Sequence, residues 1–188
     1  MIVWSFVRTG LSGSISMEQF IKHIEIKGLT GPTNPGTATW AFVVITTIST
    51  EYYHQAGYIG ENITNNAAEL RAFIEALRYI ELKGWKGFVV KTGLVTLIQQ
   101  LSRARSVVDN QSPFLAEARY LLKQTRCSVE WRAESRNNYA TDYARKLYFK
   151  ARRGELVPSP MVMLKLVEGY YSADEDEPGQ QLQLPLFG

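Results

Sequence analysis

Apolar residues recur along the chain with two periods, one of about two residues and one of about 3.6 residues. Segments rich in β-branched and aromatic residues predict buried strands, and apolar residues at helical spacing predict amphipathic helices. The predicted strands cover residues 24–26, 39–47, 52–59, 88–92 and 127–133. The predicted helices cover residues 94–101, 112–123 and 139–153. A longer helix runs from the Thr64-Asn65-Asn66 turn, whose short polar side chains can cap it, to Gly84.

The predicted elements follow one another in the order β-β-β-α-β-α-α-β-α. Three strands joined by hairpins precede strands that are separated by helices. This order indicates an α/β protein with a mixed five-stranded sheet flanked by helices. We expect residues 21–154 to form this domain, after an N-terminal extension of residues 1–20.

The segments after the domain differ from it in composition. Residues 155–171 are expected to form a C-terminal extension that packs on the domain, in which residues 161–167 either add a strand or pack on the body. Residues 172–188 read as an acidic linker and a short tail. We find no internal repeat.

Composition narrows the protein class. The chain has 188 residues, of which 45% are hydrophobic, so most of it should fold. The single cysteine, Cys127, excludes a disulfide within the chain and a metal cluster built on cysteines. The longest apolar run, residues 156–166, is interrupted by Pro158 and Pro160 and is too short to cross a membrane. We therefore expect a cytoplasmic protein without a membrane partner.

Charge is divided unevenly between body and tail. The net charge is +3, but residues 1–167 carry +8, whereas five acids and no Lys or Arg follow from Glu168 onward. A basic body favours a nucleic-acid surface, with the acidic tail either masking it or binding separately. Solubility alone is the simpler interpretation.

Four local motifs occur in an order that resembles the ribonuclease H family. They are Ile24-Glu25-Ile26 followed by Asn34-Pro35-Gly36, the segment AGYIGENITNNAAELRAFIEAL at residues 56–77, FVVKTGL at residues 88–94, and residues 131–147. The resemblance covers residues 22–153, and TNN followed by Glu69-Leu70 is its most specific part. It implies the ribonuclease H-like fold.

The resemblance also implies a chemistry, which this chain only partly matches. The family cleaves the RNA strand of RNA–DNA hybrids with two divalent ions held by a cluster of acidic residues, which must offset the charge of both ions. Glu69 and Asp142 match two of the acidic positions, but Leu29 and Gly93 occupy the other two. We therefore expect Mg²⁺ or Mn²⁺ to bind weakly or not at all. The alternative for Glu69 and Asp142 is stabilisation of helix N-termini.

Another acid could in principle complete the metal site. Glu61 and Glu134 lie in predicted loops near the expected cleft, but neither comes from a rigid strand end.

A binding role needs no metal. The resemblance implies that Asn65 and Asn66 contact the minor groove of a hybrid and that Asn34 and Asn138 lie near the cleft; helix capping and loop roles are the alternatives. Basic side chains that could contact phosphates are Lys91, Arg103, Arg105, Arg132 and Arg136.

The last residues, QLQLPLFG, resemble the peptide by which bacterial polymerases and repair proteins bind the sliding clamp. In that resemblance Gln183 bonds at the rim of an apolar pocket, whereas Leu184, Leu186 and Phe187 supply the apolar contacts. The alternative is a hydrophobic latch that folds back onto the body.

Three functions follow from these features. The first is a catalytically inactive ribonuclease H-like adaptor that touches nucleic acid and is recruited to the clamp. The second is a metal-dependent nuclease for RNA–DNA hybrids with an atypical acidic site. The third is a protein-binding module in which Leu29 and Leu94 extend an apolar patch.

Overall fold

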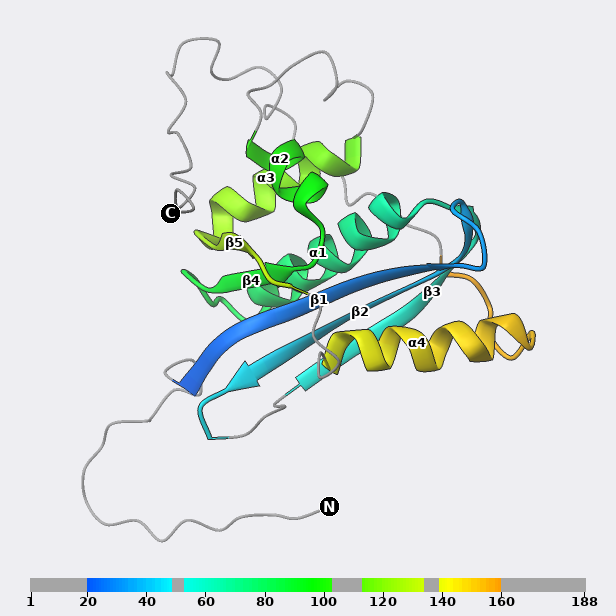
Figure 1. Ribbon diagram of the computed structural model, residues 1–188. Coiled ribbons are helices and arrows are strands. Elements are labelled where there is room, and N and C mark those ends of the chain that lie inside the picture. Colours follow the sequence, from blue (N-terminus) through cyan, green and yellow to red (C-terminus); the bar gives the residue numbers. More distant parts are fainter. Residues whose placement is uncertain (1–19, 49–52, 103–112, 134–138, 160–188) are drawn as a thin grey trace, which may run out of the picture.

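The protein forms a five-stranded sheet with helices on both faces (Figure 1). The computed structural model describes residues 20–48, 53–102, 113–133 and 139–159. The strands are β1 (Ile21–Gly31), β2 (Gly36–Thr46), β3 (Tyr53–Ile63), β4 (Val89–Thr92) and β5 (Ser128–Trp131). The helices are α1 (Asn65–Leu82), α2 (Val95–Ser102), α3 (Pro113–Thr125) and α4 (Tyr139–Arg152). This order confirms the predicted one.

The sheet has the spatial order β3-β2-β1-β4-β5, so β3 and β5 are its edges among the described strands. The first three strands pair antiparallel, and Ile26 lies opposite Phe42. Strand β4 pairs parallel to β1, with Ile24 beside Val90, and β5 pairs parallel to β4. The parallel pairs require crossovers, which α1 and the α2–α3 segment supply.

Helices α1, α2 and α3 lie on one face of the sheet, and α4 lies on the other (Figure 1). The larger core lies beneath α1, where Ile26, Phe42, Phe73 and Leu77 are fully buried. The smaller core lies beneath α4 and is built from Ala41, Val43, Ile45, Ala140 and Ala144. Alanine at two positions of α4 lets this helix approach the strands closely.

The structure lengthens two predicted strands. Strand β1 begins at Ile21 and ends at Gly31, whereas the prediction covered only residues 24–26. The sequence did not show the full strand, because Glu25 and Lys27 are polar residues that are nevertheless buried, on the α4 face. Strand β3 continues to Ile63, past Asn62, whose φ of 58° lies in the left-handed region.

No described helix combines the length and the apolar character that a membrane span needs. Helix α4 ends at Arg152, and Gly154 follows it with a φ of 71°, which a glycine adopts without strain. Most of the predicted N-terminal extension and all of residues 160–188 lie outside the described residues.

Candidate functional site

Glu69 is buried where β1, β4 and α1 meet. Its side chain lies in the second turn of α1 and is 1% exposed. One carboxylate oxygen, Oε2, accepts a hydrogen bond from the backbone N–H of Gly28 at 2.5 Å. The other, Oε1, accepts from the Thr92 hydroxyl at 2.5 Å, and that hydroxyl oxygen accepts from the backbone N–H of Leu94 at 3.1 Å. Both oxygens of Glu69 therefore bond to groups of the fold.

Gly28 allows α1 to approach β1 this closely. A methyl group at Gly28 would lie 2.0 Å from the backbone nitrogen of Glu69 and 2.2 Å from the carbonyl carbon of Ala68. Atoms cannot approach to such distances, so the contact requires glycine. The absence of a side chain at position 28 is what brings the Glu69 carboxylate to the end of β1.

Leu29 and Gly93 occupy the two positions where the ribonuclease H pattern predicts acids. Leu29 packs against the small core beneath α4. Gly93 lies between the end of β4 and the start of α2. Neither side chain can ligate a cation. Leu94 packs against the core beneath α1, so Leu29 and Leu94 contact opposite faces of the sheet and do not join into one exposed patch.

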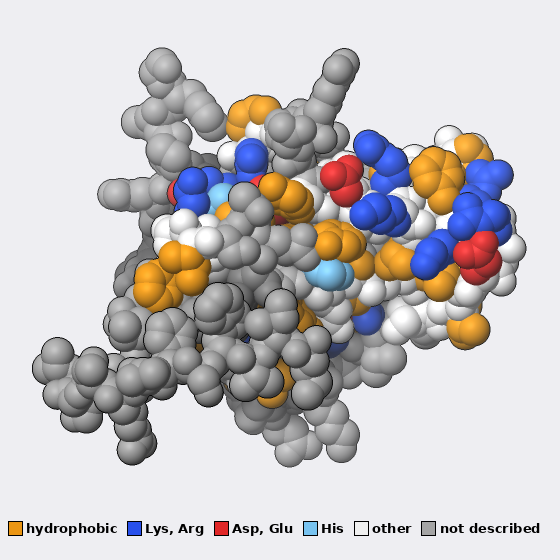
Figure 2. Space-filling model, turned by 90° about the horizontal axis from the view of Figure 1, so that it is seen from below, with side chains coloured by type: hydrophobic (Ala, Val, Ile, Leu, Met, Phe, Trp, Pro, Cys, Tyr) orange, Lys and Arg blue, Asp and Glu red, His pale blue; other side chains and the backbone are white. Residues whose placement is uncertain are grey.

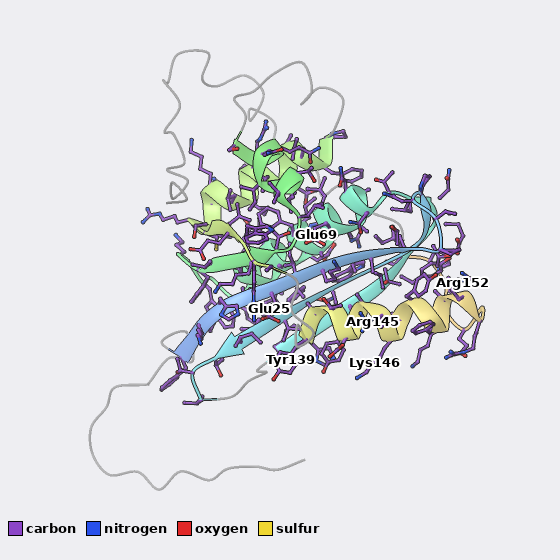
Figure 3. The ribbon with its side chains drawn as sticks, viewed as in Figure 1. Glu25, Glu69, Tyr139, Arg145, Lys146 and Arg152 are labelled. Atoms are coloured by element: carbon purple, nitrogen blue, oxygen red, sulfur yellow. The ribbon has the colours of Figure 1, made fainter. Side chains whose placement is uncertain are left out.

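Asp142 lies in the first turn of α4, and its side chain is 50% exposed. Its Oδ1 lies 3.8 Å from Nη1 of Arg145, one turn further along the helix. Figure 3 shows Glu69 and Tyr139, the first residue of α4, on different sides of β1. Glu69 is therefore buried with both carboxylate oxygens hydrogen-bonded, whereas the Asp142 carboxylate is half exposed to solvent.

Glu61, predicted to lie in a loop, instead lies on β3, near the end of α4 that is remote from Asp142. Its carboxylate accepts hydrogen bonds from the Thr37 and Tyr58 hydroxyls, each at 2.7 Å. These two bonds, together with the positive charge of Arg152, hold the pKa of Glu61 below its ordinary value. Burial and the bond to Glu61 raise the pKa of Tyr58 to about 12. Arg152 lies ten residues after Asp142, which is about 15 Å along a helix.

A two-ion centre requires several carboxylates around cations that are about 4 Å apart. In the described ranges no group of three or more His, Cys, Asp or Glu side chains could hold a metal ion. Both oxygens of Glu69 are already hydrogen-bonded, and Glu61 lies near the end of α4 that is remote from Asp142. Within the described ranges, Glu69, Asp142 and Glu61 therefore do not form the group of carboxylates that two divalent ions need.

Asparagines gather at the N-terminus of α1. Thr64 is the N-cap, and its hydroxyl accepts from the backbone N–H of Ala67 at 3.2 Å, which confirms the predicted capping. Asn34 Oδ1 accepts from the backbone N–H of Asn65 at 3.0 Å. Asn66 Oδ1 accepts from the Thr96 hydroxyl at 3.4 Å. The side chains of Asn34 and Asn66 are exposed, and with their oxygens turned to the protein each retains an NH₂ group that can donate.

A buried polar cluster at the start of the sheet was not predicted. Nη1 of Arg132 donates to Oε1 of Glu25, and His23 Nε2 lies 3.3 Å from the same oxygen. Burial would raise the pKa of Glu25, but the contact with His23 and the charge of Arg132 keep the pKa below its ordinary value. Arg132, one of the side chains that could contact phosphates, forms an ion pair with Glu25. The alternation of His23, Glu25 and Lys27 on one strand was the available signal.

Several predicted residues lie outside the described part of the chain. Lys91 lies inside it, on β4 between Glu25 of β1 and Glu130 of β5 in the strand register. Those outside are Arg103, Arg105, Glu134, Arg136, Asn138, Gln183, Leu184, Leu186 and Phe187.

Comparison with known proteins agrees with this architecture. Residues 30–147 match the family described as reverse transcriptase-like. No curated protein matches the chain in sequence. The N-terminal RNase H domain of Rv2228c from Mycobacterium tuberculosis, solved as a fusion with maltose-binding protein, is 28% identical with a TM-score of 0.60. The similarity covers 70% of this chain and 95% of that one.

Two further solved structures share the fold. RNase H1 from the halophilic archaeon Halobacterium salinarum is 24% identical with a TM-score of 0.57, over 66% of this chain and 94% of that one. LC11-RNase H1, a compost metagenome protein solved with an RNA/DNA hybrid, is 20% identical with a TM-score of 0.58, over 69% and 97% of the two chains. With a family match over more than half of its length, this chain belongs to the ribonuclease H-like family, in the group described as reverse transcriptase-like.

Proposed function

We propose that this protein is a catalytically inactive ribonuclease H-like adaptor that binds nucleic acid and is recruited to a bacterial sliding clamp through its C-terminal tail. The observation that carries the proposal is the state of Glu69. Its two oxygens hold β1 and β4 together through Gly28 and Thr92, so the carboxylate serves the fold. Leu29 and Gly93 supply no replacement ligand.

Nucleic-acid binding is supported by the donors at the N-terminus of α1. Asn34 and Asn66 both lie at the N-terminus of α1, where Asn34 bonds to the backbone of Asn65 and Asn66 bonds to Thr96. Phosphate, sugar and minor-groove base edges present mostly acceptors, which such donors suit without a metal. LC11-RNase H1 was solved with an RNA/DNA hybrid, which makes a hybrid the natural first ligand to test.

Recruitment to the clamp is supported by the sequence alone. Gln183, Leu184, Leu186 and Phe187 follow an acidic segment and lie near the end of the chain. A tethered peptide raises the effective concentration of the domain at its target, so weak nucleic-acid binding would suffice. Residual Mg²⁺ or Mn²⁺ binding at Asp142 is not required for this role.

The binding test uses substitutions that keep the internal hydrogen bonds. Asn34→Asp and Asn66→Asp retain the accepting oxygen but replace the NH₂ donor. Gln99→Glu, on the exposed side of α2, adds the same single charge as either asparagine substitution, but outside the site. We expect fluorescence anisotropy with a labelled RNA–DNA hybrid at low salt to show about tenfold weaker binding for the double asparagine variant. The Gln99→Glu variant should lose much less affinity for the hybrid.

Equal affinity of the double variant and the wild-type protein would overturn the proposed contact surface. No hybrid binding at low salt would overturn nucleic-acid binding itself, because counterion release makes such binding strongest there. That outcome would favour the protein-binding module.

A further inference from the structure

A backbone hydrogen bond joins the outer edge of the sheet to the chain that follows α4. Strand β3 is an edge strand, paired with β2 among the described strands. After α4 the chain turns back at Gly154 and reaches this edge (Figure 1). There the backbone N–H of Ser159 donates to the carbonyl of Tyr58 at 2.7 Å. Pro158 lies beside Gly60, 3.9 Å from where a methyl group on that glycine would be.

These two contacts show the direction in which Pro158 and Ser159 pass β3. Residue numbers rise from Pro158 to Ser159 while they fall from Gly60 to Tyr58, so the chain runs antiparallel to β3. In an antiparallel pair every second residue exchanges backbone hydrogen bonds with the partner. Continuing from Ser159 and Tyr58, Met161 would lie opposite Ala56, and Met163 opposite His54.

The prolines fit this register. Pro158 and Pro160 flank Ser159, so both fall at positions where the backbone nitrogen would face away from β3. A proline is tolerated in an edge strand only at such positions, because it has no N–H to donate. A register shifted by one residue would turn both prolines toward β3.

The side chains fit the two surfaces beside β3. On the α4 face, a groove of about 680 Å³ lies between β3 and α4. Its lining includes Ala56, Tyr143, Leu147 and the 53% exposed Phe149. His54 stacks on Tyr143 along it, with ring centroids 3.8 Å apart. Met161 and Met163 would face this groove, and methionine fills irregular apolar gaps well.

The opposite face of β3 offers a second apolar surface. Tyr53, 37% exposed, stacks on Tyr79 of α1 with ring centroids 4.3 Å apart. Leu164 would lie opposite Tyr53, and Val162 opposite Gln55. A strand buried on both faces should be apolar at consecutive positions, and residues 161–164 read Met-Val-Met-Leu.

We propose that residues 159–164 form a sixth strand, antiparallel to β3, which closes the groove between β3 and α4 with Met161 and Met163. The occupant of this edge is the chain's own extension, which is covalently continuous with Ser159. Figure 2 shows Lys and Arg side chains around the last turns of α4, where Lys146, Lys150 and Arg153 rim the groove. Their aliphatic stems can cover the methionines while their charges remain in water.

One consequence rests on the proposed function. Strand β3 ends at Ile63, beside Asn34 and Asn66, and begins at Tyr53 at the other end of the sheet. An antiparallel sixth strand carries the chain toward Tyr53. The tail that contains Gln183 and Phe187 would then leave from the end remote from the asparagines, so nucleic acid and clamp could bind together.

Disulfide trapping in the full chain tests the register. His54→Cys with Met163→Cys places two thiols on the same face of paired strands, whereas His54→Cys with Val162→Cys places them on opposite faces. Cys127 is buried, and peptide mapping separates its products. We expect the first pair to form an intramolecular disulfide at least about tenfold faster than the second, whose Cβ atoms point apart.

Equal rates for the two pairs, or no bond in a folded protein, would overturn the proposal. Disulfide-linked dimers would instead assign the edge to a second copy of the chain.

Amide hydrogen exchange gives a test that adds no cysteines. Met161→Pro removes an N–H that should donate to Ala56, whereas Val162→Pro falls at an outward position like those of Pro158 and Pro160. We expect the Ala56 amide to exchange at least about tenfold faster in Met161→Pro and at an unchanged rate in Val162→Pro. The same exchange rate in both variants would contradict the sixth strand, whatever the proposed function of the tail.

Discussion

The carboxylate of Glu69 accepts the backbone N–H of Gly28 at 2.5 Å, although the two residues are 41 positions apart in the sequence. This contact exists because Gly28 lets α1 press against β1. A second bond, from Thr92, connects the same carboxylate to β4. Glu69 thus links α1, β1 and β4, and its substitution should lower the stability of the fold.

Glu69→Ala is expected to lower the free energy of unfolding by about 2–4 kcal/mol, because the Gly28 N–H and the Thr92 hydroxyl would remain buried without their acceptor. Urea denaturation monitored by circular dichroism measures this change. Glu81→Ala, on the exposed side of the same helix, is the matched control and should stay within about 0.5 kcal/mol of the wild type. Equal stabilities of the two variants would show that Glu69 does not support the fold.

Gly28→Ala tests the close approach of α1 to β1. A methyl group 2.0 Å from the Glu69 nitrogen must push the helix away, which should cost about 3 kcal/mol or more, or prevent folding. Gly84→Ala has nothing within 4 Å but a φ of 68°, so only about 1 kcal/mol of backbone strain is expected. Thermal unfolding of both variants compares the two costs, and a greater loss in Gly84→Ala would refute this account of position 28.

Glu25 should make stability depend on pH. Its folded pKa lies below the ordinary value of 4.5, so its contribution is present above that pH and is lost as pH falls through the folded pKa. Glu25→Gln is expected to cost about 1–3 kcal/mol at pH 7, because Arg132 loses a charged partner. The difference in free energy of unfolding between Glu25→Gln and the wild type should become smaller below about pH 4.5, as the Glu25 carboxylate is protonated.

Urea titrations at several pH values measure this effect. Glu130→Gln, at an exposed position on β5, is the control and should produce no such narrowing. If Glu25→Gln lowers the free energy of unfolding by the same amount at every pH, the effect does not come from the charge of the Glu25 carboxylate.

The sequence predicted what depends on neighbours in the chain. Thr64 was found as a cap because its hydroxyl bonds three residues ahead, and the order of elements followed from local periodicity. The position of Glu69 was also found, through its motif, but its bonding was not. Gly28 and Thr92 reach it across 41 and 23 residues, and no local pattern records that convergence.

The same limit explains the other omissions. Arg132 lies 107 residues from Glu25 in the sequence. The sequence therefore could not show whether Arg132 forms an ion pair or is a solvated surface cation. Strand β1 was predicted too short because its buried polar residues give the sequence pattern of a segment exposed to solvent. Prediction failed where polar side chains are buried against partners that are distant in sequence.

Phe187→Ala tests recruitment to the clamp. Few residues carry the energy of such a peptide, so we expect isothermal titration calorimetry with a bacterial sliding clamp to show at least about a hundredfold loss of affinity. Leu182→Ala changes the residue just before Gln183 and should bind nearly as the wild type does. Undiminished clamp binding by Phe187→Ala would show that Phe187 does not recruit the protein to the clamp.

Cleavage of a labelled RNA–DNA hybrid tests the central claim most directly. The full-length protein would be incubated with the hybrid and Mg²⁺ or Mn²⁺ over a broad pH range, beside Asp142→Asn, with folding of both verified by circular dichroism. We expect no cleavage by either protein, because Leu29 and Gly93 supply no carboxylate and the Glu69 oxygens bond to Gly28 and Thr92. Metal-dependent cleavage by the wild type that disappears in Asp142→Asn would contradict it and identify an active nuclease.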